Sequence, residues 1–141
     1  MKKKVLVDMS VTLLHHGHIR LLKKASKIGT VYVGLSSDAD IKRFKGYKPE
    51  LKYKYRKEIL ESIKFVSKVV KVNYHVTDND LKKYRINALV HGNDLSNHLK
   101  ACKAIVFKRT KNISSSLIRK KSFEIYRYEK IRKKMERNLD K

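Results

Sequence analysis

Short apolar runs, each bounded by polar residues, alternate along this chain with stretches whose apolar positions follow the helical repeat. The runs are rich in β-branched residues and have the length of buried strands; they span residues 4–8, 30–35, 68–73, 88–91 and 104–108. Helical patterns cover residues 18–28, about 53–64 and 80–84, with a short turn near 95–100. Gly29 supplies a stop after the first of these helices. The chain therefore alternates expected strands with expected helices.

This alternation predicts a parallel sheet with helices on both of its faces. Because crossovers between parallel strands are right-handed, few topologies are open to the chain. We expect a Rossmann-like α/β fold, a three-layer sandwich around a five-stranded parallel sheet in the order 3-2-1-4-5. In that order the first and fourth strands are neighbours, and ligands bind at the carboxyl ends of the strands that flank the reversal.

Polar segments follow three of the expected strands at the ends where a ligand is expected. The first strand leads into residues 15–18, His-His-Gly-His, and the fourth ends in residues 91–94, His-Gly-Asn-Asp. The fifth leads into residues 109–119, which contain Arg-Thr and a run of three serines. Since the carboxyl ends of parallel strands share one edge of a sheet, we expect these three segments to converge there.

The segment 15–18 has the chemistry of a phosphate site. It lies where a strand ends and a helix begins, so free backbone N–H groups and the positive end of the helix dipole point out of it. Gly17 permits close approach to the backbone, and His15 and His18 add side-chain donors. A zinc site is an alternative, but it needs further ligands at metal-site spacing, and Cys102 and the remaining histidines are scattered. A second alternative is that these histidines are ordinary packed or solvated residues.

The serine run predicts a second helix N-terminus at the same place. Ser114, Ser115 and Ser116 precede apolar residues, so one of them is expected to cap a helix that faces the crevice. Arg109 can grip phosphate oxygens through its planar guanidinium, and Thr110 adds a hydroxyl donor. The alternative for a serine run is a plain cap or loop.

Length and composition limit the class of protein. A chain of 141 residues is one domain that can bury a core, and no apolar run approaches the length of a membrane span. The lysines before residues 5–7 mimic a signal peptide, but Asp8 breaks the apolar run, so we expect no signal peptide. The single cysteine cannot form an internal disulfide, and we expect a cytoplasmic protein.

The formal net charge of +23 predicts anionic partners, which include nucleotides, nucleic acids and acidic lipid surfaces. The alternative is a solvated basic surface that has no dedicated target.

Two motifs in the chain resemble those of a known superfamily. Residues 13–22, Leu-Leu-His-His-Gly-His-Ile-Arg-Leu-Leu, resemble the HxGH signature of nucleotidyltransferases, and among these they look most like small cytidylyltransferases of the glycerol-3-phosphate kind. Residues 109–116 are similar to the second signature of that family, with Asn112 in place of a glycine. Asparagine visits left-handed backbone conformations more readily than most residues. The resemblance covers about residues 4–119, so we divide the chain into a nucleotidyltransferase domain, 1–119, and a basic tail, 120–141.

The resemblance implies a reaction of CTP with a small phosphorylated alcohol or phosphonate, which releases pyrophosphate. It places His15 and His18 at the α-phosphate and leaving oxygen, and Lys45 and Arg109 at the β- and γ-phosphates. The implied nucleotide-binding residues are Ser10, Val11, Arg56, Asp94, Thr110, Ser114, Ser115 and Ser116. Mg²⁺ is implied as a companion of CTP, held mostly by phosphate oxygens and water rather than by protein ligands. Because the attacking oxygen is already anionic, we expect no general base and no Asp–His dyad.

The family also implies a homodimer built on the segment 63–70, although Ser67 and Lys68 stand where the family carries Asp-Glu. Residues 9–12, Met-Ser-Val-Thr, replace the usual Gly-Thr-Phe-Asp and look more like cytidylyltransferases of phosphonate pathways. Two other functions stay open. Residues 113–119 also resemble the ISSTxIR motif of adenylyltransferases. The second open function is that of a non-catalytic nucleic-acid-binding domain. No RRM-type aromatic signature or zinc-finger spacing supports it, so we expect no specific nucleic-acid partner.

The tail alternates Ile125, Tyr128 and Ile131 with many lysines and arginines, a pattern typical of a basic amphipathic helix. We expect this helix to dock on its own domain or on a dimer partner. Contact between its basic face and an anionic membrane is the alternative.

Overall fold

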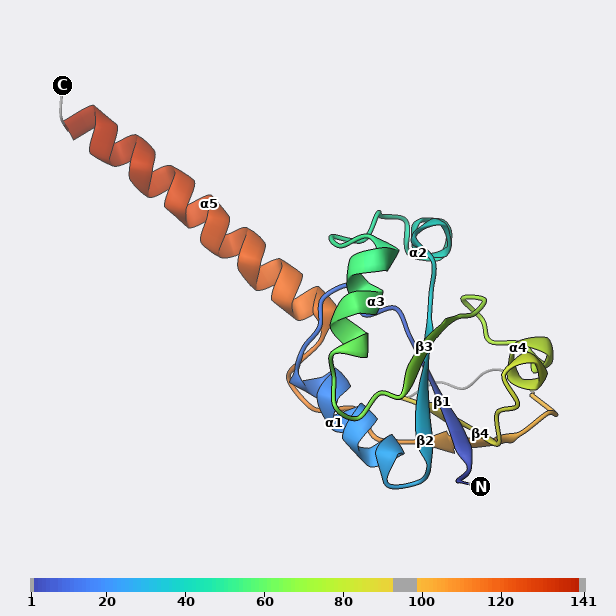
Figure 1. The fold of residues 1–141 in the computed structure, drawn as a ribbon. Coiled ribbons are helices and arrows are strands. Elements are labelled where there is room, and N and C mark those ends of the chain that lie inside the picture. The colour runs from blue at the N-terminus through green and yellow to red at the C-terminus, as the bar shows by residue number, and fades with distance from the viewer. Residues whose placement is uncertain (1, 93–98, 140–141) are drawn as a thin grey trace.

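A computed structural model describes residues 2–92 and 99–139 as an α/β domain from which one long helix projects (Figure 1). The elements in chain order are β1 (Lys4–Met9), α1 (His16–Ser26), β2 (Thr30–Leu35), α2 (Asp38–Lys45), α3 (Tyr53–Glu61), β3 (Lys68–Lys71), α4 (Asp78–Lys83), β4 (Ala88–His91), β5 (Lys103–Val106) and α5 (Ser115–Leu139). All five expected strands are present within two residues of their predicted ends.

The strands form one parallel sheet in the order β3-β2-β1-β4-β5, which confirms the predicted fold and order. Successive residues of β1 face opposite layers. Val5 and Val7 pack with Leu22 of α1 and Leu60 of α3, whereas Leu6 packs with the α4 side. α1 and α3 therefore cover one face of the sheet and α4 the other (Figure 1). Because apolar side chains are buried on both faces of the sheet, the strand sequences are continuous apolar runs rather than alternating apolar and polar residues.

Helix ends depart from the prediction where a side chain caps the helix. α1 starts at His16, two residues earlier than expected, because His15 is its N-cap. α4 starts at Asp78 because Thr77 and Asp80 form a reciprocal capping box there. α3 ends at Glu61, earlier than the expected residue 64. The turn expected near residues 95–100 falls mostly on 95–98, which lie outside the described residues.

α2 was not predicted from the sequence. Ser37 caps it by accepting from the Asp40 N–H, and Gly46 ends it with a left-handed backbone at φ 79°. Two acidic residues in its first turn and three basic residues in its last turn also suit the helix dipole. These signals were available in the sequence. Lys45 therefore lies in the last turn of this helix.

α5 does not dock on its own domain, so that part of the expectation for the tail is wrong, whereas docking on a dimer partner stays a prediction. None of its residues is buried, and the helix extends away from the sheet (Figure 1). It also passes without a break through the expected boundary between residues 119 and 120. Within the described ranges, no helix combines the length and apolar character needed to cross a bilayer.

Candidate active site

A pocket of about 470 Å³ opens at the carboxyl ends of the central strands, as expected for this sheet order. Its volume lies within the range typical of small-molecule sites. All three polar segments that follow β1, β4 and β5 contribute to its lining. The predicted site residues in the lining are Ser10, Val11, His15, His18, Lys45, Arg109, Thr110, Ser114, Ser115 and Ser116.

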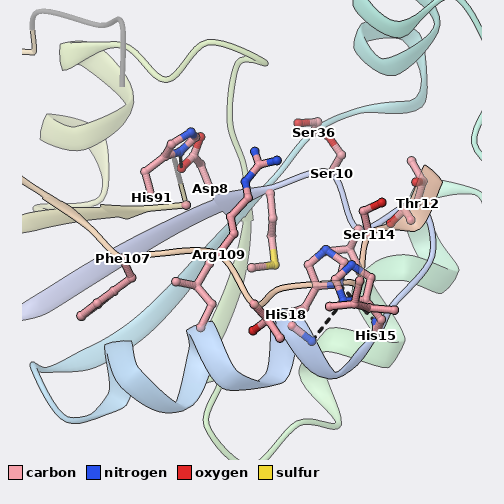
Figure 2. Close-up of a pocket in the computed structure, with 18 of the residues that line it drawn as sticks. Asp8, Ser10, Thr12, His15, His18, Ser36, His91, Phe107, Arg109 and Ser114 are labelled. Atoms are coloured by element: carbon pink, nitrogen blue, oxygen red, sulfur yellow. Dashed lines mark hydrogen bonds and ion pairs between the residues drawn. The ribbon is translucent and has the colours of Figure 1, made fainter. Parts of the chain in front are cut away.

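His15 and His18 hold each other in place at the N-terminus of α1. The Gly17 N–H donates to His15 Nδ1 at 3.1 Å, and the His15 N–H donates to His18 Nδ1 at 3.2 Å. The two rings lie in contact, with centroids 3.8 Å apart (Figure 2). Because each Nδ1 accepts a backbone proton, each neutral ring carries its own proton on Nε2. The pair therefore has Nε2–H groups with which to donate hydrogen bonds to an anion.

The surroundings keep both histidines neutral near pH 7. Burial, and to a smaller extent the neighbouring His15 and Lys45, together lower the pKa of His18 from 6.5 to about 3. Burial, followed by the proximity of His16, also lowers the pKa of His15. A proton on either Nδ1 is incompatible with the backbone bonds that this atom accepts. The capping box thus selects the neutral form.

Gly17 serves this pair directly. A Cβ at this position lies 2.9 Å from both Cε1 and Nδ1 of His15, which is too close for any side chain. The glycine therefore makes room for the His15 ring against the backbone of α1, in addition to the ligand access expected from the sequence.

The N-terminus of α5 also lines the pocket. Ser114 Oγ accepts from the Leu117 N–H at 3.1 Å, so Ser114 is the cap that the serine run predicted. Ser115 Oγ donates to the Leu13 carbonyl at 2.9 Å and ties α5 to the turn before α1. Asn112 adopts φ 61°, the left-handed conformation expected where the related motif carries glycine. Two helix N-termini therefore lie beside one cavity.

Cationic side chains dominate the charge of the pocket. Lys45, the last residue of α2, and Arg109, which follows β5, both line it as predicted. Arg20, Lys24 and Lys108 line it as well and were not predicted. Two of them could have been predicted from the sequence. Arg20 and Lys24 follow Gly17 at intervals of three and four residues and therefore lie on the same face of the helix.

Arg56 does not line the pocket and has a structural role, and its contact with the nucleotide stays a prediction. Its side chain is 1% exposed, and its guanidinium donates to the carbonyls of Ser10, Ser36 and Leu51 and to the Asp38 carboxylate. With these acceptors engaged, Arg56 fixes the backbone on which Ser10 and Ser36 face the cavity. Asp94, the remaining predicted site residue, lies outside the described residues.

An Asp–His pair lies in the pocket, so the expectation of a site without such a dyad is wrong. His91 Nδ1 lies 2.6 Å from Asp8 Oδ1, and both residues line the cavity. Figure 2 shows this pair at one end of the site, the His15–His18 pair at the other, and Arg109 between them. Asp8 is the only carboxylate among the described lining residues. The register of β1 and β4 places Val7 beside Val90, and so brings the next residues of the two strands, Asp8 and His91, close together.

Arg119 links three segments at the rim of the site. Its guanidinium pairs with the Glu50 carboxylate, donates to Thr12 Oγ1 at 3.3 Å and lies over the ring of Tyr47 at 4.6 Å. Tyr47 itself lines the pocket. α5 is thereby connected to the loop 46–52, which follows Lys45, and to the turn after β1.

Val11 carries backbone strain in that same turn. It is buried and has φ 44°, a conformation that a β-branched residue rarely adopts. Strain of this kind persists only where the surrounding structure enforces it, and it is commonest at functional sites.

The described residues include no group of three or more His, Cys, Asp or Glu side chains placed to hold a metal ion. Cys102, the thiol that a zinc site would draw on, packs against the α4 side of the sheet and away from the His15–His18 pair.

Comparison with known proteins agrees with this geometry. The model of the cytidylyltransferase-like family matches residues 12–121. The chain belongs to the cytidylyltransferase-like family. It is therefore a nucleotidyltransferase, and the resemblance carried by the two sequence motifs is confirmed.

Named relatives extend over most of the chain. A glycerol-3-phosphate cytidylyltransferase of Bacillus spizizenii is 34% identical over 84% of this chain and 95% of its own length. The enzyme of that name from Staphylococcus aureus is 29% identical over 86% and 96%. A phosphopantetheine adenylyltransferase of Pyrococcus furiosus is 32% identical over 87% of this chain and 70% of its own length.

A solved structure resembles the fold. The lipopolysaccharide core biosynthesis protein of Thermoplasma volcanium superposes with a TM-score of 0.68 at 17% identity, over 79% of this chain and all of that one. At this identity the likeness shows the shared α/β architecture alone.

Proposed function

We propose that the protein transfers the cytidylyl group of CTP to a phosphate oxygen of a small acceptor, with glycerol-3-phosphate as the leading candidate. One observation carries the proposal: the His15–His18 pair, two helix N-termini and five cationic side chains surround one cavity in a chain about 30% identical to enzymes of that name. Helix N-termini and cations together favour a ligand rich in phosphate.

The pocket has the parts for an in-line displacement. In the proposed step an anionic oxygen of the acceptor attacks the α-phosphorus of CTP and forms a P–O bond. The bond from that phosphorus to the bridging oxygen breaks, and pyrophosphate departs with the electron pair. No proton has to be removed from the attacking oxygen. The protein contributes position and charge stabilisation.

We assign the roles from the arrangement of donors. His15 and His18 donate through Nε2–H to the α-phosphate and the bridging oxygen, where charge develops. Lys45 and Arg109 neutralise the β- and γ-phosphates. The hydroxyls of Thr110, Ser114 and Ser116 complete the cradle, whereas Ser115 uses its proton on the Leu13 carbonyl and so acts as a brace.

The donor set of the pocket suits Mg²⁺ that enters with the nucleotide. Asp8, its one described carboxylate, is engaged with His91, so phosphate oxygens and water are left as the main ligands. Bound in this way, Mg²⁺ neutralises charge on the triphosphate. A homodimer and a cytoplasmic location remain predictions.

Adenylyl transfer is the second candidate. It is favoured by the relative from Pyrococcus furiosus, named as an adenylyltransferase, whose 32% identity is in the range of the cytidylyltransferases although less of its length is matched. A phosphonate acceptor is a variant of the first proposal. It is suggested by Met9 and Ser10, which resemble the corresponding residues of cytidylyltransferases of phosphonate pathways.

The test is release of pyrophosphate from CTP or ATP with each of several acceptors: glycerol-3-phosphate, phosphocholine, phosphoethanolamine, 2-aminoethylphosphonate, phosphopantetheine and nicotinate mononucleotide. We expect turnover with CTP and glycerol-3-phosphate. The variant His18→Ala should lose about 100-fold in kcat. His16→Ala is the matched control, because His16 is exposed and does not line the pocket. Turnover with ATP alone selects the second candidate, and equal activity of the two variants contradicts the assigned role of His18.

A further inference from the structure

α5 presents an unusually large solvent-exposed surface. It has 25 residues and none is buried, so it extends for about 37 Å at the helical rise. Several large apolar side chains are open to solvent along it, among them Ile125 at 61%, Tyr128 at 69% and Met135 at 62% exposure. An isolated helix of this kind gains little stability in water, because helices in proteins depend on covering an apolar face. The surface therefore needs a partner that the described part of the chain does not supply.

When the exposed residues are placed at 3.6 residues per turn, most of the apolar ones gather on one face and most of the basic ones on the other. We define the apolar stripe as Ile125, Tyr128, Ile131, Met135 and Leu139, which occupy about a third of the circumference. We define the basic face as Arg127, Lys130, Lys133, Lys134 and Arg137, which lie on the opposite side together with the exposed rings of Phe123 and Tyr126. Lys120 lies at the edge of the stripe. The three glutamates of the helix lie on the stripe or at its edges and leave the basic face without an acid.

Charge distinguishes among the possible partners. α5 carries nine basic and three acidic residues, so it has a strong positive excess. A second copy of the helix meets this one with like charge, which opposes pairing. A nucleic acid satisfies the basic face but leaves the apolar stripe in water. A lipid surface that contains acidic headgroups can interact with both faces. The apolar stripe is buried among the acyl chains, and the cations contact the phosphates of the headgroups.

Three charged positions, Lys121, Glu124 and Arg132, lie within the stripe, and the two basic ones are compatible with this arrangement. Lys121 has a long aliphatic stem that can lie along an apolar surface while its ammonium reaches the headgroups. Arg132 is paired with Glu136 at 3.5 Å, so it does not present an isolated charge.

We propose that α5 binds the surface of anionic membranes, lying in the interface with its apolar stripe at the boundary between headgroups and acyl chains. The proposal does not depend on the reaction catalysed, and the helix lies on the membrane rather than crossing it.

The test is co-sedimentation of the full chain with vesicles of phosphatidylglycerol and phosphatidylcholine, compared with vesicles of phosphatidylcholine alone. We expect binding to the anionic vesicles that is at least tenfold tighter. The decisive variant is Tyr128→Ser with Met135→Ser, at the centre of the stripe. The matched control is Tyr126→Ser with Phe123→Ser, on the opposite side of the same helix. Both variants keep every charge, and neither changes a buried residue.

We expect the stripe variant to bind anionic vesicles at least tenfold more weakly and the control to stay within about threefold of the unaltered chain. Equal binding by both variants means adsorption by charge alone and overturns the proposal. Sedimentation equilibrium without lipid provides a second check. A dimer that is lost in the stripe variant shows that a second copy covers the stripe, and this too overturns the proposal.

Discussion

At the scale of single residues, the site depends on two histidines that are held by backbone groups. His15 caps α1 through Nδ1, and His18 returns a bond of the same kind to the His15 N–H. Such a box usually has serine or threonine at the N-cap and glutamate or glutamine three residues later. With histidine in both positions, one ring nitrogen fixes the helix start while the other stays available for donation. The same arrangement links the protonation state of the site to the stability of the fold.

This link predicts a loss of stability in acid. The pKa of His18 in the folded protein is about 3, below its ordinary value of 6.5. Between these two pH values His18 is protonated in the unfolded chain but neutral in the folded protein. Above pH 6.5 the residue is neutral in both states and contributes nothing. We expect the free energy of unfolding to fall by up to about 2 kcal/mol from pH 6.5 to pH 5 through His18. Urea denaturation at pH 7 and pH 5 measures it.

The comparison that isolates His18 uses His18→Gln and, as a control, His16→Gln. The first variant should lose less stability between the two pH values than the unaltered chain does, whereas the control should lose as much. Identical losses in all three proteins contradict the lowered pKa of His18.

At the scale of elements, the loop 46–52 and α5 form one unit at the rim of the pocket. The pairing of Arg119 with Glu50 spans 69 residues, and it is reinforced by the Tyr47 ring under the guanidinium. The hydrogen bond from Arg119 is the main cause of the lowered pKa of Glu50. Because this loop follows Lys45 directly, the pair is placed to hold Lys45 and Tyr47 against the cavity.

We therefore predict that the Arg119–Glu50 pair acts through nucleotide binding in the proposed reaction. Glu50→Gln and Arg119→Gln should each raise KM for CTP about tenfold and change kcat by less than about threefold. The double variant should be no worse than Arg119→Gln alone, because that variant already removes the contact with Glu50. Arg119→Lys should recover part of the loss. Steady-state kinetics of the four proteins measures this, and fully additive effects argue against a shared role.

At the scale of the whole molecule, the net charge of +23 acts on the fold as well as on the site. Five of the cations meet at the pocket and others repeat along α5, so like charges lie close together in the compact state. Repulsion of this kind destabilises a folded protein, and salt screens it.

We predict that the unfolding temperature rises by about 5 °C when sodium chloride increases from 20 to 300 mM. Differential scanning calorimetry measures the change. Sodium sulfate at equal ionic strength serves as a comparison, and a larger rise in sulfate reports anion binding at the helix N-termini in addition to screening. An unfolding temperature that falls with added chloride contradicts net repulsion.

The local features of the chain were predictable because they depend on neighbours in sequence. Burial on both faces of a parallel sheet requires the continuous apolar runs from which the strands were predicted. The His15–His18 turn and the Ser114 cap follow from residues within three or four positions of each other. α2 was missed although its signals, Ser37 and Gly46, are equally local.

What the tertiary structure alone decided are contacts between residues far apart in the chain. Asp8 and His91 meet because the register of β1 on β4 is set by packing of the whole core, and a shift of one residue separates them. Arg56 is buried rather than ligand-facing because carbonyls from three separate segments surround it. The amphipathic pattern of α5 was visible in the sequence, but only the fold shows that no surface of its own domain covers it. The hydrophobic pattern of the sequence indicates which side chains are apolar and so favour burial. The arrangement of helices and strands determines which residues these side chains contact.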